Sequence, residues 1–234
     1  ARFFEDPVRI CGILHFLPNS IFLMRPELIL FDLDGTLVDS APDLAAAANA
    51  LRTARGLDPV DPEALRPVAS RGSAALVDAV LGISDEALRQ EFLANYAAGC
   101  ANLTRPYPGV RAMLEKLRAE GLTLAVVTNK PVALAGRVLE GLELMPLLSG
   151  FWGSDSPGSA MKPDPAGIRL AMRTLGTDDA LYVGDDPTDA KAAAAAGIPA
   201  ALVRWGYAKT PLDAAQARIL AGDPAELAAE ILAL

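Results

Sequence analysis

Two aspartates directly after a short apolar run are the residues of this sequence best suited to do chemistry. The run Leu28–Phe31 is typical of a fully buried parallel strand, and Asp32 and Asp34 follow it two positions apart. Side chains at that spacing on an extended strand point the same way, so both carboxylates can face one point. Gly35 lets the backbone bend, and Thr36 adds a hydroxyl beside the pair. Asp-Gly alone is typical of a turn, but two convergent acids after a buried run favour a functional site.

Polar residues also follow other apolar runs of the chain. They are Thr128 and Asn129 after the run 122–127, Lys162 before Pro163, and Asp185, Asp186 and Asp189 after the run 180–183. In a parallel sheet such residues gather at the carboxyl edge of the strands. Carboxylates, hydroxyls and a lysine suit Mg²⁺-assisted phosphoryl transfer, because Mg²⁺ prefers carboxylate and phosphate oxygens.

Several of these residues also have a purely structural interpretation. Thr128 and Asn129 could cap the helix that follows them, and Lys162 could be a solvated side chain. Asp186 and Asp189, three residues apart, could form a capping box. The occurrence of all of them at the ends of predicted strands favours the site.

The pattern of residues 41–105 predicts several helices and no strand. Ser40, followed three residues later by Asp43, predicts a capping box that opens the first helix. An apolar stripe at i, i+4 spacing in residues 88–100 predicts a helix whose stripe packs in a core. We therefore interpret this stretch as an inserted helical unit.

After residue 106 the pattern alternates between helix and strand. Helices are expected at 110–120, 131–142, 165–175 and 225–232, and strands at 122–127, near 151, at 180–183 and at 199–203. Repeated strand–helix units predict an α/β fold with a parallel, doubly wound sheet.

Residues 1–26 differ in pattern from the rest and are interpreted as an N-terminal extension. The apolar run 10–17 is shorter than the about 20 residues that cross a bilayer, and no small-residue cleavage site follows it. Because Met24 stands just ahead of the first strand, we hypothesise that residues 1–23 are dispensable. Loss of soluble, active protein on deletion would refute this.

Composition narrows the classes of function. The 234 residues are 52% hydrophobic, enough for one core domain plus a smaller unit. A net charge of -8 argues against a nucleic-acid or anionic-membrane surface. Cys11 and Cys100 lie far apart, which favours a reduced, cytoplasmic setting. His15 is the single histidine and lies outside the expected core, so a Ser-His-Asp mechanism has no base.

Four of these segments resemble the motifs of the haloacid dehalogenase-like hydrolase superfamily, in the family's order. They are DLDGT at 32–36, TN at 128–129, KP at 162–163, and GDD with the later aspartate at 184–189. The resemblance extends over about residues 27–233. Five segments are most similar to bacterial phosphoglycolate phosphatases and their close relatives: 34–44, 71–73, 126–131, 162–165 and 204–207.

The resemblance implies a fold and a reaction. The fold is a Rossmann-like parallel core of residues 27–40 and 106–234, with residues 41–105 as an α-helical cap domain. The reaction is Mg²⁺-dependent hydrolysis of a small phosphorylated metabolite, most closely 2-phosphoglycolate, through an aspartyl-phosphate.

The resemblance also implies roles for individual residues. Asp32 is the nucleophile and Asp34 the general acid and base. The side chains of Asp32 and Asp185 and the backbone carbonyl of Asp34 are the metal ligands. Thr128 and Lys162 hold the phosphoryl oxygens.

A second group of residues is assigned to substrate binding and support. Asn129 is expected at the substrate, and Thr36, Asp186 and Asp189 are expected to support the site. Arg71, next to Gly-Ser in the cap, is the candidate cation for a substrate carboxylate, with a surface arginine as the alternative.

Other functions remain open on the sequence. The substrate could be a bulkier sugar phosphate such as N-acetylmuramic acid 6-phosphate, or the enzyme could be a phosphomutase. A dehalogenase would share Asp32 but would not need Asp34. A catalytically silent binding module is the alternative from a different class. The sequence carries no signal for the oligomeric state.

Overall fold

The structure is a computed structural model that describes residues 25–83, 85–208 and 212–234. The predicted N-terminal extension lies outside the described residues except for its last two positions, as do Cys11 and His15. Within the described residues, none of the helices has the length and apolar character needed to cross a membrane.

A six-stranded parallel sheet forms the centre of the larger part of the molecule. Its strands, in spatial order, are β5 (Gly150–Trp152), β4 (Thr123–Val127), β1 (Leu28–Phe31), β6 (Ala180–Gly184), β7 (Ala200–Val203) and β8 (Ile219–Ala221). β1 pairs with β4 and β6, with Leu28 in register with Thr123 and Ala180. All of β1 is buried, which explains its continuous apolar run. The predicted parallel sheet is confirmed.

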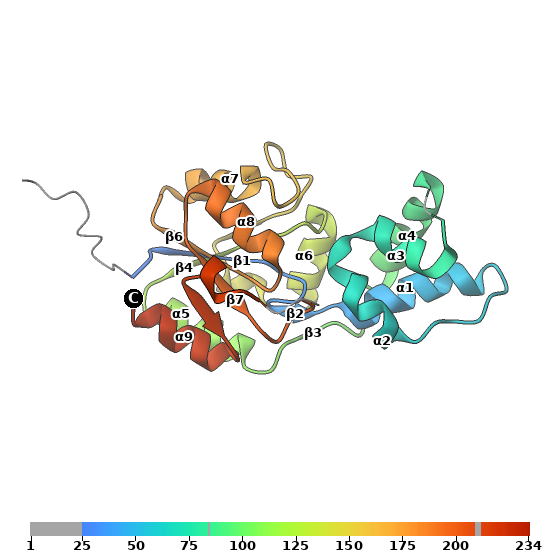
Figure 1. The fold of residues 1–234 in the computed structure, drawn as a ribbon, viewed down its shortest axis with the longest axis horizontal. Coiled ribbons are helices and arrows are strands. Elements are labelled where there is room, and N and C mark those ends of the chain that lie inside the picture. Colours follow the sequence, from blue (N-terminus) through green and yellow to red (C-terminus); the bar gives the residue numbers. More distant parts are fainter. Residues whose placement is uncertain (1–24, 84, 209–211) are drawn as a thin grey trace, which may run out of the picture.

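Helices cover both faces of this sheet (Figure 1). They are α5 (Val110–Ala119), α6 (Val132–Gly141), α7 (Ala166–Leu175), α8 (Pro187–Ala196) and α9 (Pro224–Leu232). Ile29 and Phe31 of β1 pack in one core cluster with α5, α6 and α9. Leu28 and Leu30 belong to a second cluster with α7 and α8. Successive residues of a buried strand thus serve opposite layers, as in a doubly wound fold.

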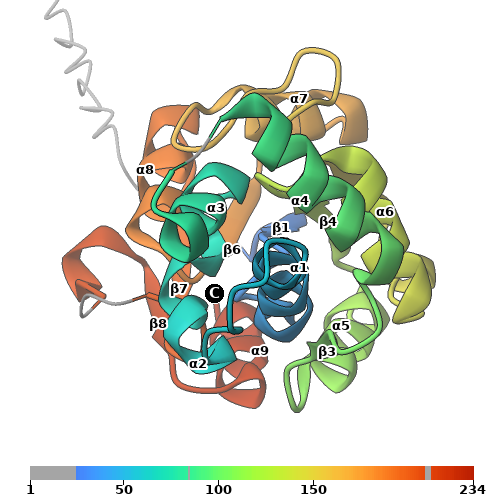
Figure 2. The ribbon, with the colours of Figure 1, turned by 90° about the vertical axis from the view of Figure 1, so that its right-hand side faces the viewer.

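A group of helices that we call the cap stands off the carboxyl edge of the sheet (Figures 1 and 2). It comprises α1 (Ala41–Thr53), α2 (Pro62–Leu65), the 3₁₀ helix η1 (Arg66–Arg71), α3 (Ser73–Leu81) and α4 (Glu86–Gly99). The predicted stripe of residues 88–100 is buried, with Phe92 and Tyr96 at most 2% exposed. An α/β fold with a Rossmann-like core and an inserted helical cap is therefore confirmed. The domain boundaries at residues 41 and 105 stay a proposal.

The chain enters and leaves the cap through a two-stranded antiparallel ribbon. Val38 of β2 (Val38–Asp39) pairs with Pro106 of β3 (Arg105–Pro106). Neither strand of the ribbon was predicted, because two residues cannot show a periodic pattern.

The predicted capping box at the start of α1 is wrong. Ser40 stands at the N-cap position but makes no side-chain capping bond. Its Oγ instead donates to Asp34 Oδ1 at 2.5 Å. Asp43, 4% exposed, accepts from the backbone N–H groups of Leu103 and Thr104 and from the Thr104 hydroxyl. The partner of Ser40 lies six positions earlier and those of Asp43 lie 60 and 61 positions later, and these contacts replace the local cap.

Candidate active site

Three carboxylates meet at the ends of the neighbouring strands β1 and β6. Asp32 follows β1, and its N–H donates to Val183 O of β6 at 2.8 Å. Asp185 follows β6, and Asp189 lies in the first turn of α8. One carboxylate oxygen from each of the three aspartates lies within 4.8 Å of the other two. The structure thus brings Asp32 and Asp185 together, and it adds Asp189 to them.

Asp185 is the most tightly enclosed of the sequence-predicted metal ligands, with 1% exposure. Its Oδ1 accepts from the Thr36 hydroxyl at 3.0 Å, and its Oδ2 accepts from the Tyr207 N–H at 2.8 Å. A Cβ at Gly35 would lie 2.4 Å from Asp185 Oδ2, and one at Gly206 would lie 2.3 Å from Asp185 Cβ. Gly35 also has a φ of 87°. Only glycine fits at these two positions while the carboxylate keeps its place.

Burial and neighbouring charge raise the pKa of two of these carboxylates, Asp32 and Asp185. Burial raises the pKa of Asp32 to about 6 against the opposing charge of Lys162, and Asp189 adds to the rise. Burial raises the pKa of Asp185 well above its usual range, with further contributions from Asp189 and Asp32. Three acids around a single lysine therefore carry more negative charge than the site neutralises. This donor set fits a hard divalent cation.

Asp189 and Asp186 have the structural role that the sequence offered as an alternative. Asp186 Oδ1 accepts from the Thr188 N–H at 2.8 Å, and Asp189 Oδ2 accepts from the Asp186 N–H at 3.0 Å. The predicted capping box is confirmed. Asp189 also accepts from the Asp185 N–H at 3.1 Å, so it fixes the backbone that carries the carboxylate of Asp185.

Lys162 is not a solvated side chain. Only 4% of the side chain is exposed, and its Nζ lies 2.9 Å from Asp32 Oδ1 and 2.7 Å from Asp189 Oδ1. The ammonium also donates to the Tyr182 hydroxyl at 2.7 Å. Asn129 Oδ1 accepts from the Lys162 N–H at 2.6 Å, which ties the lysine loop to the end of β4. Tyr182 was not singled out from the sequence, because it lies inside a buried apolar run.

Thr128 is 4% exposed and borders the same cavity as Asp32. Its Oγ1 accepts from the N–H of Lys130 at 3.2 Å. The alternative that Thr128 and Asn129 cap α6 does not hold, because this helix has no capping bond from its N-cap residue, Pro131. The carboxylate of Asp155 accepts from the first N–H of α6 instead.

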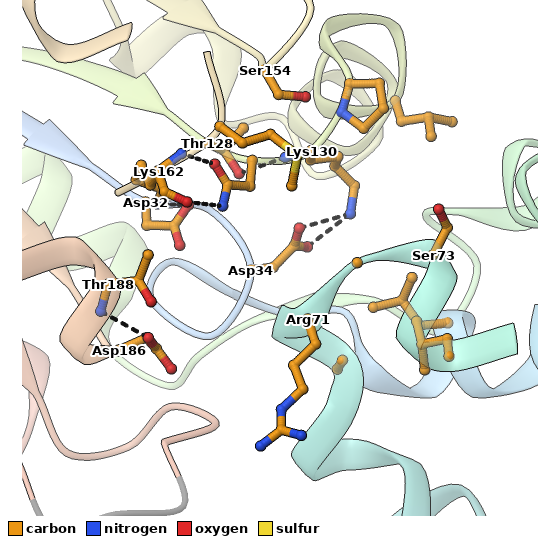
Figure 3. A pocket seen from close by; sticks show the side chains of 18 of the residues that line it. Asp32, Asp34, Arg71, Ser73, Thr128, Lys130, Ser154, Lys162, Asp186 and Thr188 are labelled. Carbon is orange, nitrogen blue, oxygen red and sulfur yellow. Dashed lines mark hydrogen bonds and ion pairs between the residues drawn. The ribbon is translucent and has the colours of Figure 1, made fainter. Parts of the chain in front are cut away.

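The carboxylate of Asp34 is turned toward the cap and away from Asp32 (Figure 3). Lys130 Nζ lies 2.9 Å from Asp34 Oδ1 and 2.8 Å from Oδ2. The Lys130 side chain is 4% exposed, and its Nζ lies 4.7 Å from the ring centroid of Tyr96 in α4. Sequence reasoning missed Lys130. The signal was present, since this lysine directly follows Asn129 at the end of a buried strand.

A cavity of about 630 Å³ lies between the strand ends and the cap. Asp32 and Lys162 line it on the side of the sheet, and Tyr96 and Arg71 line it on the side of the cap, toward which the carboxylate of Asp34 is turned (Figure 3). Arg71 is exposed, and its guanidinium points away from Asp34 (Figure 3). Its role in binding a substrate carboxylate stays a prediction.

The known proteins that are similar to this chain agree on one family. The family model for haloacid dehalogenase-like hydrolases matches residues 29–203. The N-acetylmuramic acid 6-phosphate phosphatase of Pseudomonas aeruginosa is 42% identical over 191 residues, which cover 79% of this chain and 84% of that protein. The phosphoglycolate phosphatase of Xylella fastidiosa is 40% identical over 188 residues, which cover 78% and 82%.

A solved structure has the same architecture. The crystal structure of a predicted phosphoglycolate phosphatase from Haemophilus somnus superposes with a TM-score of 0.78 at 30% identity. The match covers 88% of this chain and 97% of that one.

Proposed function

The chain belongs to the haloacid dehalogenase-like hydrolase family and is a phosphatase, and we propose that it hydrolyses a phosphomonoester through a phosphoaspartate formed on Asp32. The observation that carries this proposal is the position of Asp32 in the cavity. Its carboxylate lies in the group with Asp185 and Asp189, and 2.9 Å from the ammonium of Lys162. A nucleophile beside a cation and a metal-binding set suits attack on a phosphate.

We propose Mg²⁺ as the metal. The residues that would hold it are Asp32 and Asp185 through their carboxylates, and Asp34 through its backbone carbonyl. Asp189 has both oxygens occupied, by Lys162 and by two backbone N–H groups, so we assign it an orienting role. Bound there, Mg²⁺ would neutralise negative charge on the phosphoryl oxygens.

The protein's own residues carry the steps. Asp32 attacks phosphorus, the bond from phosphorus to the ester oxygen breaks, and Asp34 gives its proton to the departing alkoxide. Asp34 then takes a proton from the water that hydrolyses the phosphoaspartate. Lys162 and Thr128 donate to the phosphoryl oxygens, where positioned donors are worth on the order of 100-fold or more in rate. To act, Asp34 has to exchange its present contact with Lys130 for one with the ester oxygen.

We propose 2-phosphoglycolate as the substrate, which the name of the relative from Xylella fastidiosa and the resemblance of five segments support. N-acetylmuramic acid 6-phosphate is the second candidate. The relative from Pseudomonas aeruginosa supports it, as does a cavity of about 630 Å³ that exceeds the volume of a two-carbon leaving group. We also propose a reducing, cytoplasmic location; among the described residues the free cysteine is Cys100, which is buried.

The test is a screen for Mg²⁺-dependent phosphate release. 2-Phosphoglycolate, N-acetylmuramic acid 6-phosphate, other sugar phosphates and nucleotides are compared with Mg²⁺ and with a chelator, using Asp32→Asn as the inactive control. We expect phosphate release that needs Mg²⁺ and is fastest with 2-phosphoglycolate. Isomerised sugar phosphate without free phosphate would indicate a phosphomutase. No turnover of any phosphoester would favour a silent binding module.

A further inference from the structure

Lys130 is a buried cation for which the steps above have no use. Its ammonium contacts both oxygens of Asp34, at 2.9 and 2.8 Å, and faces the ring of Tyr96. In this position it holds the general acid away from Asp32 (Figure 3). A residue that only restrained Asp34 would oppose the reaction. Lys130 therefore needs a second partner when Asp34 turns to the substrate.

Tyr96 supplies the second observation. The residue is 2% exposed and lines the cavity, and its O–H group has no hydrogen-bond acceptor among the described residues. An unpaired buried hydroxyl is unfavourable unless a bound molecule pairs with it. The cavity thus has a cation and a free hydroxyl donor next to each other, beside the general acid.

The place of this pair relative to the ester oxygen limits what can bind. During the reaction the Asp34 carboxyl has to reach the ester oxygen of the substrate. When Asp34 turns to that oxygen it leaves the ammonium of Lys130, which is then open to a group one or two bonds beyond the oxygen. In a phosphoester of a 2-hydroxy acid, the carboxylate is two bonds from the ester oxygen. That carboxylate can replace Asp34 at the ammonium with no change in the charge around it.

The other cations that line the cavity are less suited to this contact. Lys162 is held by Asp32 and Asp189. Arg89 pairs with Glu86 at 2.8 Å and its side chain is 40% exposed. Arg71 is exposed and points away from Asp34 (Figure 3).

We propose that Lys130, with the Tyr96 hydroxyl, binds a carboxylate two bonds from the ester oxygen, and that this exchange frees Asp34 to turn to the ester oxygen. Lys130 is then a specificity and positioning residue, and the preferred substrates are phosphoesters of short 2-hydroxy acids. The inference rests on the proposed phosphatase activity.

The experiment compares two substrates of equal length on the Mg²⁺-loaded full chain. 2-Phosphoglycolate carries the carboxylate, and 2-hydroxyethyl phosphate has a neutral hydroxymethyl group in its place. The readout is the ratio of their kcat/KM values. We expect the wild type to favour 2-phosphoglycolate and Lys130→Met to lower the ratio by about 10- to 100-fold, the range for a lost hydrogen bond to a charged group. Lys130→Arg should restore part of the ratio, and Tyr96→Phe should lower it by a few-fold.

Two further variants make the result specific. Lys116 is an exposed lysine on α5 outside the cavity lining, so Lys116→Met should keep the wild-type ratio. Arg71→Met removes the rival cation. If it abolishes the preference while Lys130→Met keeps it, the carboxylate binds at Arg71 and the inference is wrong.

Other outcomes also test the proposed role of Lys130. Equal changes in kcat/KM on both substrates in Lys130→Met would leave the ratio unchanged and show that Lys130 does not bind the carboxylate. A wild type without preference would also overturn the site. If Lys130→Met does not fold, as judged by its melting temperature, the inference is tested by the ratio of kcat/KM values for the two substrates in Lys130→Arg and Tyr96→Phe. Absence of phosphate release by the wild type from any phosphomonoester would be a failure of the proposed function instead.

Discussion

The two sides of the cavity are built in different ways. On the side of the sheet, the charged groups are held by several partners that all come from the core. Lys162 contacts two carboxylates and a tyrosine hydroxyl, and Asp185 accepts from a hydroxyl and a backbone N–H. On the side of the cap, Asp34 is held by Lys130 and Ser40, and Lys130 contacts the cap through the ring of Tyr96. We infer that the sheet side holds the nucleophile and the metal ligands, whereas the cap side positions the general acid and selects the leaving group.

The largest effect should come from the sheet side. Asp32→Asn removes the proposed nucleophile, so we expect kcat to fall on the order of 10⁴-fold or more with every substrate. Because the raised pKa of Asp32 shows that its charge is unfavourable in the metal-free fold, the neutral amide should not lower the melting temperature. Phosphate release and thermal unfolding measure the two effects. Turnover near the wild-type rate would contradict the proposed mechanism and the division between the two sides.

Asp34 should show a smaller effect that depends on the leaving group. Asp34→Asn removes the proposed general acid, and general acid catalysis is worth typically about 10²- to 10⁴-fold in rate. The loss in the first step should be smaller for p-nitrophenyl phosphate, whose leaving group departs without a proton. Phosphoenzyme formation in single turnovers with this ester and with 2-phosphoglycolate measures the difference. Equal losses on both would remove Asp34 from the role of acid.

Metal affinity should depend on pH through the sheet side alone. Asp32 has its pKa raised to about 6 in the metal-free fold, so it takes up a proton as pH falls through that value, and proton uptake competes with the metal. The apparent affinity for Mg²⁺ should therefore be weaker at pH 5 than at pH 7.5, by about 10-fold or more. The rise in melting temperature on adding Mg²⁺, measured at both pH values, tests this. A rise that is larger at pH 5 would contradict the metal site.

The smallest effect should come from the hydroxyl that anchors Asp34. Ser40→Ala removes one neutral donor to this carboxylate, so we expect a change of about 2- to 10-fold in kcat/KM. Ser149→Ala, at an exposed serine outside the cavity lining, is the matched control and should have no effect. A loss as large as that of Asp34→Asn would mean that the cap side is as rigidly built as the sheet side.

The difference between the sheet side and the cap side also explains which parts of the fold and the site could be predicted from the sequence. Buried strands and the polar residues at their ends are local signals, and the rule for parallel sheets then brings Asp32 and Asp185 together. The cap side depends on contacts between distant segments. The Ser40 N–H donates to the Tyr207 hydroxyl, which lies 167 positions away, and Tyr96 looks like any packed aromatic residue of a helix. No local pattern marks such partners.

Several short elements escaped prediction for a physical reason, although the three-residue strand β5 was expected near residue 151. The strand β8 has three residues and each strand of the ribbon has two, too few to show a period. The capping box at Asp186 was predicted correctly, because both of its partners lie within one turn. The one at Ser40 failed, because the Ser40 hydroxyl donates to Asp34, which precedes the helix, and Asp43 accepts from Thr104, which lies 61 positions away.

The pairing of Val38 with Pro106 brings the two ends of the helical insertion side by side. A tight turn could close this gap, so removing or exchanging the helices would leave the register of the six strands untouched. Such a joint allows one cap to be replaced by another in evolution. The range of phosphoesters hydrolysed would then change while the catalytic residues of the core are kept.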